Sequence, residues 1–316
     1  MTDGYGRTID YLRISITDKC NLRCRYCMPE EGISHLLHSD VLSFEEIQRI
    51  VYIMEGLGIK KVRLTGGEPL VKRGVTELVR MLPCDVYMTT NGCELAKYAG
   101  PLKEAGLRGV NVSLDTLDAD TFRALTGTDE LDRVLDGIRA AKEAHLDVKL
   151  NCVPIKGIND HETESLCEYA KSQGLVIRFI ELMPIGCAKG HTGIMSCDII
   201  TRLENAFGKA SEDTSPDTGP AKYYTFGNTG IKAGFISPLS HRFCDKCNRI
   251  RLTADGYLKT CLFYSNGTDL RRLIRSGADD EEIKHAIENA INNKPPAHSF
   301  GKESAKDNRR MVQIGG

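Results

Sequence analysis

The chain has 316 residues, of which 41% are hydrophobic and 27% charged, a composition typical of globular proteins with one large domain or two smaller ones. Lysine plus arginine (42) nearly balance aspartate plus glutamate (43), and a net charge of -1 excludes a globally basic surface that would wrap nucleic acid. The N-terminus lacks the apolar core of a signal peptide, and no stretch approaches the ~20 apolar residues that span a bilayer. We therefore expect a cytoplasmic protein with neither membrane nor nucleic-acid partners.

The first two thirds of the chain alternate between short apolar strands and amphipathic helices. One helix begins with a capping box of Ser43 and Glu46, and another is predicted from about Glu130 to Ala144. The expected strands are Leu12–Thr17, Lys61–Thr65, Val86–Thr90, Val110–Leu114, Val148–Val153 and Leu175–Glu181. Right-handed crossovers curl such strands into a barrel, and six strands fall short of the eight in a closed barrel. We predict an α/β fold, an incomplete (β/α)6 TIM-type barrel with one open side.

The sequence changes in character after about residue 210. Residues 211–222 are polar and rich in turn formers, which predicts a linker or long loop. Beyond it we expect a hairpin of Arg249–Ala254 and Tyr257–Phe263, joined by a type I′ turn at Asp255-Gly256, and then helices at 269–276 and 280–292. This divides the chain into a partial barrel, residues 1–215, and a smaller C-terminal α+β domain, residues 216–316, that covers the open side.

Six of the twelve cysteines fall into two groups of three. A shuffled chain would contain the spacing of the first group only about 0.02 times. This group directly follows the first strand, at the carboxyl end where barrel enzymes place active sites. Three thiolates are one fewer than an ordinary electron-transfer cluster uses, so one metal position would stay open for a ligand; zinc or buried inert thiols are the alternatives. The groups are Cys20, Cys24 and Cys27 (C-x3-C-x2-C) and Cys244, Cys247 and Cys261 (C-x2-C-x13-C).

The motifs around the first cysteine group resemble those of the radical S-adenosylmethionine (radical SAM) enzymes. Tyr26 lies between the last two cysteines, and Thr65-Gly66-Gly67-Glu68-Pro69 follows the second strand. The resemblance implies that the three cysteines hold a 4Fe-4S cluster whose open iron binds the methionine group of S-adenosylmethionine. It places Tyr26 at the adenine, Gly67 at the methionine group, and Ser113 and Met183 at the rest of this cofactor. The alternatives are a turn for the glycine pair, a surface position for the tyrosine and core packing for the methionine.

The second cysteine group resembles that of the GTP 3′,8-cyclase family, which carries out the first step of molybdenum cofactor (molybdopterin) biosynthesis. The likeness covers nearly the whole chain and includes YLRISITDKCN, KVRLTGGEP, TTNG, GVNVSLDTLD, VKLNCV, RFIELM, FCDKCNRIRLT and the closing QIGG. It implies a second three-cysteine 4Fe-4S cluster, whose open iron binds the guanine of GTP.

Several basic residues on predicted strands are candidates to bind the roughly four negative charges of a nucleoside triphosphate. Arg249 and Arg251 alternate with apolar neighbours, so they share one face of their strand and can clamp an anion. Ordinary salt bridges are the alternative for the other basic residues. The candidate substrate-binding residues are Arg13, Arg63, Lys149, Arg249 and Arg251, with Thr89, which could also be a turn or capping residue, added by the resemblance.

The resemblance also implies a reaction and partners. Reductive cleavage of S-adenosylmethionine gives a 5′-deoxyadenosyl radical, which removes the 3′ hydrogen from the ribose of GTP. The substrate radical attacks carbon 8 of guanine, and reduction yields (8S)-3′,8-cyclo-7,8-dihydroguanosine 5′-triphosphate, so the enzyme is classed as a lyase. The implied partners are an electron donor such as a flavodoxin or ferredoxin and a downstream cyclic pyranopterin monophosphate synthase, and a homodimer is compatible with the sequence.

The chain closes with a polar tail, for which disorder is the ordinary expectation. Met311–Ile314 could instead form an extended strand anchored by Val312 and Ile314, followed by two residues without side chains. Because similar cyclases end in the same pair, the resemblance implies that Gly315 and Gly316 enter the active site and help position the radical chemistry.

Two other functions remain open from the sequence. A radical SAM enzyme with another substrate, such as a peptide, would not need the basic residues near the second cysteine group. A zinc-binding scaffold for partner proteins would hold two zinc ions in place of about eight iron atoms. The remaining cysteines form no motif and are predicted to be small buried hydrophobic residues: Cys84, Cys93, Cys152, Cys167, Cys187 and Cys197.

Overall fold

One twelve-stranded sheet organises the chain in the computed structural model, which describes residues 1–213, 219–300, 307 and 309–315. The strand order is β12-β11-β10-β1-β2-β3-β4-β5-β6-β9-β8-β7, and the central strands from β10 to β9 run parallel. The strands are β1 Tyr11–Ser15, β2 Lys61–Thr65, β3 Asp85–Thr90, β4 Gly109–Ser113, β5 Asp147–Cys152, β6 Val176–Ile180, β7 Ala210–Asp213, β8 Lys222–Phe226, β9 Ile231–Ile236, β10 Arg249–Leu252, β11 Tyr257–Lys259 and β12 Thr268–Asp269.

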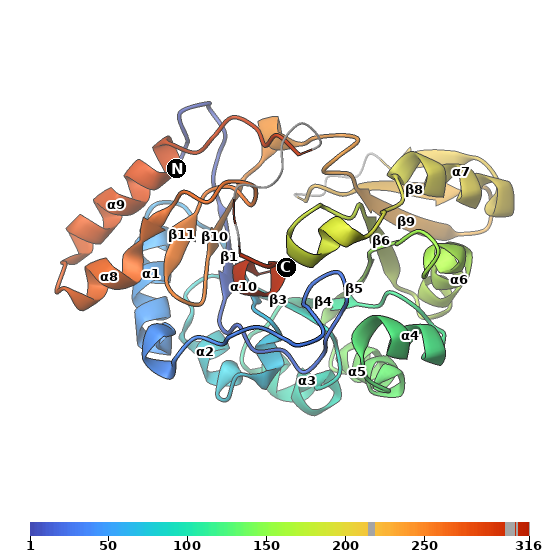
Figure 1. Ribbon diagram of the computed structural model, residues 1–316, viewed down its shortest axis with the longest axis horizontal. Coiled ribbons are helices and arrows are strands. Elements are labelled where there is room, and N and C mark those ends of the chain that lie inside the picture. Colours follow the sequence, from blue (N-terminus) through green and yellow to red (C-terminus); the bar gives the residue numbers. More distant parts are fainter. Residues whose placement is uncertain (214–218, 301–306, 308, 316) are drawn as a thin grey trace.

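Helices cover the outer face of the curved sheet and connect its parallel strands (Figure 1). Because β1 to β6 pair in chain order, their carboxyl ends lie at one mouth of the barrel. Within the described ranges, no helix combines the length and apolar character needed to cross a membrane. The helices are α1 Phe44–Gly56, α2 Val75–Met81, α3 Leu95–Glu104, α4 Ala119–Thr126, α5 Leu131–Glu143, α6 Thr163–Ser172, α7 Ser196–Phe207, α8 Leu270–Arg275, α9 Asp280–Asn292 and α10 Met311–Ile314.

The predicted incomplete barrel is confirmed. Its sheet has two edges, β12 and β7, which do not pair with each other among the described residues. The C-terminal part widens the barrel on both sides, since β10 pairs with β1 and β9 pairs with β6. Strands from this part therefore share a sheet with the barrel. The boundary between residues 215 and 216 stays a prediction.

The first helix shows how local sequence places an element. Ser43 Oγ accepts a hydrogen bond from Glu46 N, and the Glu46 carboxylate accepts one from Ser43 N, so the predicted capping box is present. The apolar face of α1 points into the core, where its buried residues are Ile47, Ile50, Val51, Ile53 and Met54.

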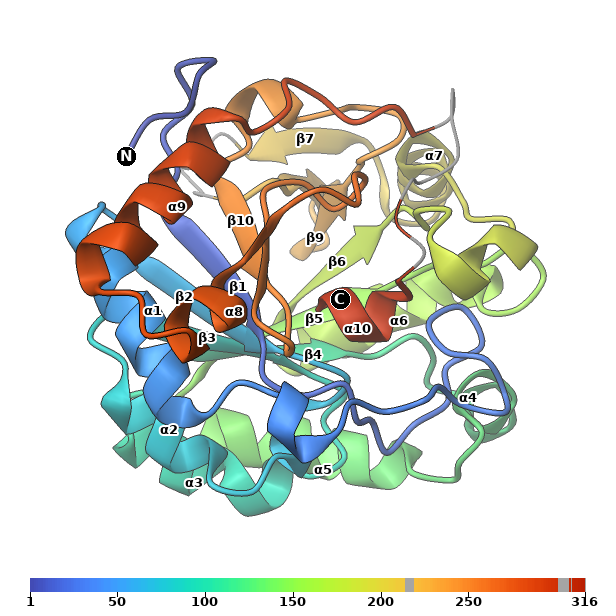
Figure 2. The ribbon, with the colours of Figure 1, turned by 60° about the vertical axis from the view of Figure 1, so that its left-hand side comes forward.

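The C-terminal helix α9 packs against α1, and α8 packs against α9, as Figure 2 shows. Arg275 at the end of α8 donates to both carboxylate oxygens of Glu46, at 2.7 and 2.9 Å. Arg49 of α1 donates to Asp280 of α9 at 2.7 Å. These exposed ion pairs align helices whose main stabilisation comes from apolar burial, with Ile283, Ile287 and Ile291 on the inner face of α9.

Two expectations about the C-terminal part are wrong in detail. Residues 210–213 form β7, antiparallel to β8, so the predicted linker begins too early. The β10–β11 hairpin is present, but its turn is not type I′, because Gly256 has a φ of +78° whereas Asp255 has no positive φ. Thr253 N donates to Tyr257 O across a three-residue loop, which matches a type I turn followed by a left-handed glycine.

A substitution at Gly137 of α5 tests how closely this helix packs against the start of α3. A Cβ at this position would lie 2.4 Å from Gly92 O, so Gly137→Ala should lower the free energy of unfolding by ~1 to 3 kcal/mol through overpacking. Gly56→Ala at the exposed end of α1 is the control, because nothing lies within 4 Å of an added Cβ and Gly56 has no positive φ. It should raise the free energy of unfolding by ~0.4 to 1 kcal/mol. Urea unfolding measures both, and equal stability of the Gly137→Ala and wild-type chains would contradict this packing.

Candidate functional site

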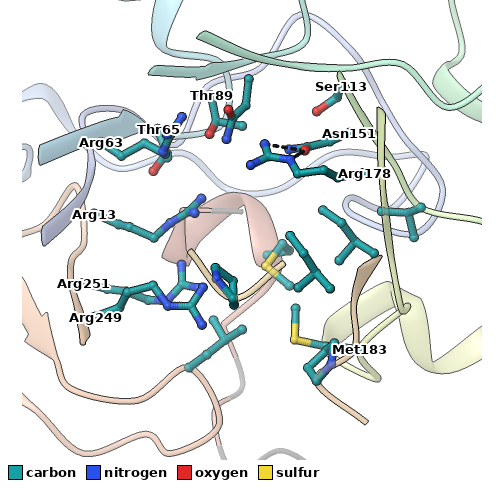
Figure 3. A pocket seen from close by; sticks show the side chains of 18 of the residues that line it. Arg13, Arg63, Thr65, Thr89, Ser113, Asn151, Arg178, Met183, Arg249 and Arg251 are labelled. Carbon is teal, nitrogen blue, oxygen red and sulfur yellow. Dashed lines mark hydrogen bonds between the residues drawn. The ribbon is translucent and has the colours of Figure 1, made fainter. Parts of the chain in front are cut away.

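One cavity inside the barrel collects most of the predicted site residues. Its volume is about 690 Å³, and its walls come from the parallel strands, the loops at their carboxyl ends and the C-terminal part. Figure 3 shows basic and polar side chains from several strands pointing toward one another across it. The predicted residues in its walls are Cys20, Cys24, Cys27, Cys244, Cys247, Cys261, Tyr26, Gly67, Ser113, Met183, Arg13, Arg63, Thr89, Lys149, Arg249 and Arg251.

The first cysteine group lies on the loop after β1, residues 18–28, which we call the first cysteine loop. Gly67 lets this loop lie directly on the end of β2. Glu68 N donates to Lys19 O at 2.8 Å, and a Cβ on Gly67 would lie 2.2 Å from the same oxygen. Only glycine permits such a close approach of two backbones. The glycine pair therefore does more than form a turn, because Gly67 allows the first cysteine loop to pack directly against the end of β2.

A buried carboxylate braces the same loop from β3. Glu68 accepts hydrogen bonds from Thr90 Oγ1 at 2.7 Å, Asn91 N at 2.6 Å and Leu70 N at 3.0 Å. Burial raises the pKa of Glu68 to about 7, although these three donors favour its ionised form. Asn91 also donates to Asn21 of the first cysteine loop at 2.8 Å. The ends of β2 and β3 and the first cysteine loop therefore form one rigid unit.

Tyr26 is held by a second buried carboxylate, at the end of β4. Its hydroxyl donates to Asp115 Oδ2 at 2.6 Å, and Val153 N donates to Asp115 Oδ1 at 2.8 Å. Burial raises the pKa of Tyr26, and the neighbouring Asp115 charge raises it further. Because the hydroxyl is engaged with the protein, the ring is fixed in orientation as part of the cavity wall.

The thiols of the first cysteine group are largely buried, and buried carboxylates lie near them. Burial raises the pKa of Cys20 to about 11 and that of Cys27 to about 12, and it raises the pKa of Cys24 well above the usual range. Among the residues that the structure describes, no three His, Cys, Asp or Glu side chains converge closely enough to hold a single metal ion. All three cysteines line the cavity, and three thiolates can each bind a different iron of a cluster, whereas a structural zinc site needs a fourth ligand.

The second cysteine group has a positive environment instead. Cys244 begins a short helical turn, Cys244–Lys246, and Cys261 follows β11. Burial alone would raise the pKa of Cys247, but the Lys294 ammonium and the Arg249 guanidinium bring it down to about 7. Nearby cations stabilise a thiolate, so this group is prepared to bind a metal centre.

The register of the sheet sets three arginines side by side. Arg13 on β1 is level with Arg251 on β10 and with Arg63 on β2. All three reach the cavity, together with Arg249 (Figure 3). Burial lowers the pKa of Arg13 to about 10, and the charges of Arg63 and Arg249 contribute to this lowering. Like charges on adjacent strands repel each other, so the row favours binding of a multiply charged anion.

The other predicted substrate residues differ in how the protein engages them. Arg63 Nη1 donates to Met88 O at 2.8 Å. Lys149 lies 3.8 Å from Asp147, so the salt-bridge alternative is present at this position. Thr89 Oγ1 is buried and has no hydrogen-bond partner among the described residues, which leaves it able to bond a ligand.

The tail residues 311–314 contradict the predicted extended strand. They form the helical turn α10, which is closed by a hydrogen bond from Arg310 N to Gln313 Oε1 at 2.9 Å. Val312 and Ile314 are buried, as expected of anchors. A helical turn wins here because the capping bond satisfies its first free N–H group while both apolar side chains still reach the core.

Gly315 follows α10 and touches the arginine row, with α10 in the mouth of the barrel (Figure 2). Arg251 Nη1 donates to Gly315 O at 2.6 Å. Gly315 has a φ of +75°, and a Cβ there would lie 2.5 Å from Thr65 Oγ1. Glycine is therefore required by both conformation and space. Gly316 lies outside the described residues.

The structure adds cavity residues that the motif analysis does not single out. Arg178 on β6 donates twice to Asn151 Oδ1 on β5, at 3.0 and 2.7 Å (Figure 3). A polar side chain in mid-strand was a usable signal for both, as it is for Arg13. Asp115 also had a signal, since it directly follows a strand. Lys294 had none, because only the tertiary fold brings it beside the second cysteine group.

The prediction that the six other cysteines are buried holds for only some of them. The prediction of burial is wrong for the exposed Cys197, because it lies on the solvent side of the first turn of α7. Cys93, Cys152 and Cys167 are buried as predicted, whereas Cys84 and Cys187 are partly exposed.

Comparison with known families agrees with this geometry. The Radical SAM superfamily matches residues 14–170, and Molybdenum Cofactor Synthesis C matches residues 175–300. The structure of Streptococcus suis SuiB bound to S-adenosylmethionine has a TM-score of 0.60 and 16% identity, over 89% of this chain and 68% of that chain, which shows the shared fold. The partial barrel and its first cysteine group define a radical SAM enzyme.

Comparison of the whole sequence with known proteins identifies the family within this class of enzymes. The GTP 3′,8-cyclase of Thermodesulfovibrio yellowstonii is 47% identical, and the alignment covers 100% of both chains. Those of Listeria monocytogenes (43%, covering 100% of this chain and 99% of the other) and Rhodopseudomonas palustris (44%, covering 95% and 90%) are similar over most of their length. The chain belongs to the GTP 3′,8-cyclase family.

Membership in the radical SAM superfamily implies a 4Fe-4S cluster and S-adenosylmethionine. The first cysteine group fits such a cluster, because its three thiols share one cavity and leave one iron without a protein ligand. The cavity offers further room for the cofactor beside this open position.

Arg251 should hold the tail in place in the ligand-free protein. Arg251→Ala removes a charged hydrogen bond to Gly315 O, worth ~1.5 to 3 kcal/mol, so carboxypeptidase should digest the tail at least about tenfold faster. Arg249→Ala is the matched control, because this guanidinium lies 4.9 Å from the ring centroid of Phe243 and bonds no described tail residue. Equal digestion rates for the two variants would contradict the role of Arg251.

Proposed function

We propose that this protein catalyses the S-adenosylmethionine-dependent cyclisation of GTP to (8S)-3′,8-cyclo-7,8-dihydroguanosine 5′-triphosphate, the first step of molybdenum cofactor biosynthesis. The observation that carries the proposal is the row of Arg251, Arg13 and Arg63 in a cavity that both cysteine groups line. A radical-forming centre and a receptor for a polyanion then share one site. The identity of 43–47% with GTP 3′,8-cyclases supports the same activity.

The second cysteine group is proposed to hold a second 4Fe-4S cluster with an iron open to the guanine of GTP. Its three cysteines are again one fewer than four iron atoms need. Lys294 and Arg249 favour the thiolate form of Cys247, as a metal ligand requires. Because Arg249 and Arg251 follow this group on β10, a guanine bound there would have its phosphates within reach of the arginine row.

S-adenosylmethionine is proposed to bind between the first cysteine loop and the ends of β2 and β4. Gly67 lies in the cavity wall beside the first cysteine loop, at the proposed position of the methionine group, and the fixed ring of Tyr26 offers a flat partner for adenine. Ser113 and Met183 line the same cavity and complete the proposed cofactor site.

The substrate triphosphate is proposed to bind the arginine row together with residues further round the barrel. The cations would neutralise its charge, and the Thr89 hydroxyl would donate to a phosphate or ribose oxygen. Lys149 would have to leave or share its partner Asp147. The proposed substrate-binding residues are Arg13, Arg63, Thr89, Lys149, Arg249 and Arg251.

When bound together, the first cluster and S-adenosylmethionine supply a carbon radical that can remove a hydrogen atom from the ribose of GTP. The chain orients the two ligands by fixing the first cysteine loop through Glu68 and the nucleotide through the arginine row. Residues of the C-terminal segments, such as Phe263, Phe300 and Val312, line the cavity and would exclude water from it. Gly315 and Gly316 are proposed as catalytic positions, because Gly315 already touches Arg251 at the mouth.

The reaction also requires an external one-electron donor, which we propose to be a flavodoxin or ferredoxin. A cyclic pyranopterin monophosphate synthase is the proposed downstream enzyme. A cytoplasmic location suits two reducible clusters and twelve cysteines without a paired disulfide among those described. A homodimer is compatible with the sequence, and light scattering can test it.

Replacing one cysteine should impair a different reaction step in each of the two cysteine groups. Cys24→Ser should abolish S-adenosylmethionine cleavage, because the open iron belongs to the first group. Cys247→Ser should retain some cleavage but lose GTP turnover. The assay measures 5′-deoxyadenosine and cyclised nucleotide under anaerobic conditions. Turnover of GTP at the wild-type rate by Cys247→Ser would show that the second group has no role in the substrate site.

Deletion of Gly315 and Gly316 should eliminate cyclised product while cluster content, S-adenosylmethionine binding and thermal stability stay near wild type. The pair contributes geometry at the site and little apolar burial, so the fold should tolerate its loss. Product yield with and without an added peptide ending in Gly-Gly measures the effect. Unimpaired cyclisation by the truncated enzyme would leave the tail without a catalytic role.

A further inference from the structure

A buried lysine connects the two segments that carry the second cysteine group. Lys294 is 3% exposed, and its ammonium donates to Arg249 O at 2.8 Å and to Thr260 O. Arg249 lies two residues after Cys247, and Thr260 directly precedes Cys261. One side chain therefore fixes the spacing of both segments.

This ammonium has an unusual charge environment. In the part of the chain that the structure describes, no carboxylate pairs with Lys294, and its acceptors are neutral carbonyls. Burial lowers the pKa of Lys294, while the thiolates of Cys247 and Cys261 raise it. A buried cation is costly unless an anion compensates it. Cysteine thiolates on an iron-sulfur cluster would supply the missing negative charge.

The opposite end of the chain holds this lysine in position. The Arg7 guanidinium donates to the carbonyls of Cys244 and of residues 294–296, at distances of 2.8 to 3.4 Å. Asp3 accepts from Arg7 Nε at 2.6 Å, and both side chains are buried. Figure 1 shows the N-terminal segment beside the end of α9, from which residues 294–296 continue. A planar guanidinium with four carbonyl partners is a rigid clamp.

We infer that Lys294 is a positioning residue that joins the two segments of the second cysteine group and raises the reduction potential of the cluster held there, and that Arg7 keeps Lys294 in place. The inference rests on the second cluster of the proposed function. Reduction adds one negative charge to a cluster, so a fixed cation beside it favours the reduced form. Neither residue needs to touch GTP for this effect.

The test uses the full-length chain with the first cysteine group changed to serine, so that iron binds at the second group alone. After anaerobic reconstitution, a redox titration gives the midpoint potential, and a chelator gives the rate of iron loss. Lys294→Met should make the potential more negative and speed iron loss about tenfold. Lys294→Gln keeps a donor for the carbonyls but not the charge, so it gives the same measurement if Lys294→Met does not fold.

Three further variants separate charge from packing. Lys246→Met is the matched control, because Lys246 is exposed between Cys244 and Cys247, and it should leave both quantities unchanged. Lys294→Arg retains the charge and should keep the potential near that of the parent. Arg7→Lys loses the fork of donors and should speed iron loss with a smaller change in potential.

The outcomes test the role of Lys294 separately from the presence of the second cluster. If the parent holds a cluster and the Lys294 variants match Lys246→Met in potential and iron loss, the inferred role of Lys294 is wrong. If the parent takes up no iron at the second group, the second cluster itself is wrong, and the inference falls with it.

Discussion

The pairing of β1 with β10 on one side and β2 on the other is the constraint on which the site depends. In a parallel sheet, residues at one level point to the same face, so this register aligns three guanidinium groups inside the barrel. Such a row is repulsive without an anion, and a well-ordered sheet is needed to hold it. Burial of the apolar strands and helices supplies that stability.

Much of the barrel could be predicted because it follows from local patterns. The strand at Lys61–Thr65 has the predicted bounds, and the Ser43 and Glu46 capping box starts α1 where its spacing indicates. The first cysteine group was visible because its spacing is rare by chance and it follows a strand end, whereas the second was recognised from the motif around it. Residues whose signal is periodic or contiguous in sequence are therefore accessible without coordinates.

The features that escaped prediction depend on contacts between distant parts of the chain. Nothing near β9 or β10 indicates that they extend the barrel sheet at β6 and β1. The helical form of the tail depends on a single capping bond, and Lys294 acquires meaning only beside Cys247. The carboxylates Glu68 and Asp115 sit in quoted motifs, but their partners on β3 and after β5 come from the fold.

The unpaired edges of the sheet have a consequence for the size of the interior. A closed eight-stranded barrel is just wide enough for its own side chains to fill. Among the described residues, no complete ring of backbone hydrogen bonds fixes the diameter, and the interior holds a cavity of about 690 Å³. Side-chain contacts such as that of Arg275 with Glu46 also hold the C-terminal helices to the barrel. Such a barrel can accommodate two large ligands at once without a longer strand or an additional domain above its mouth.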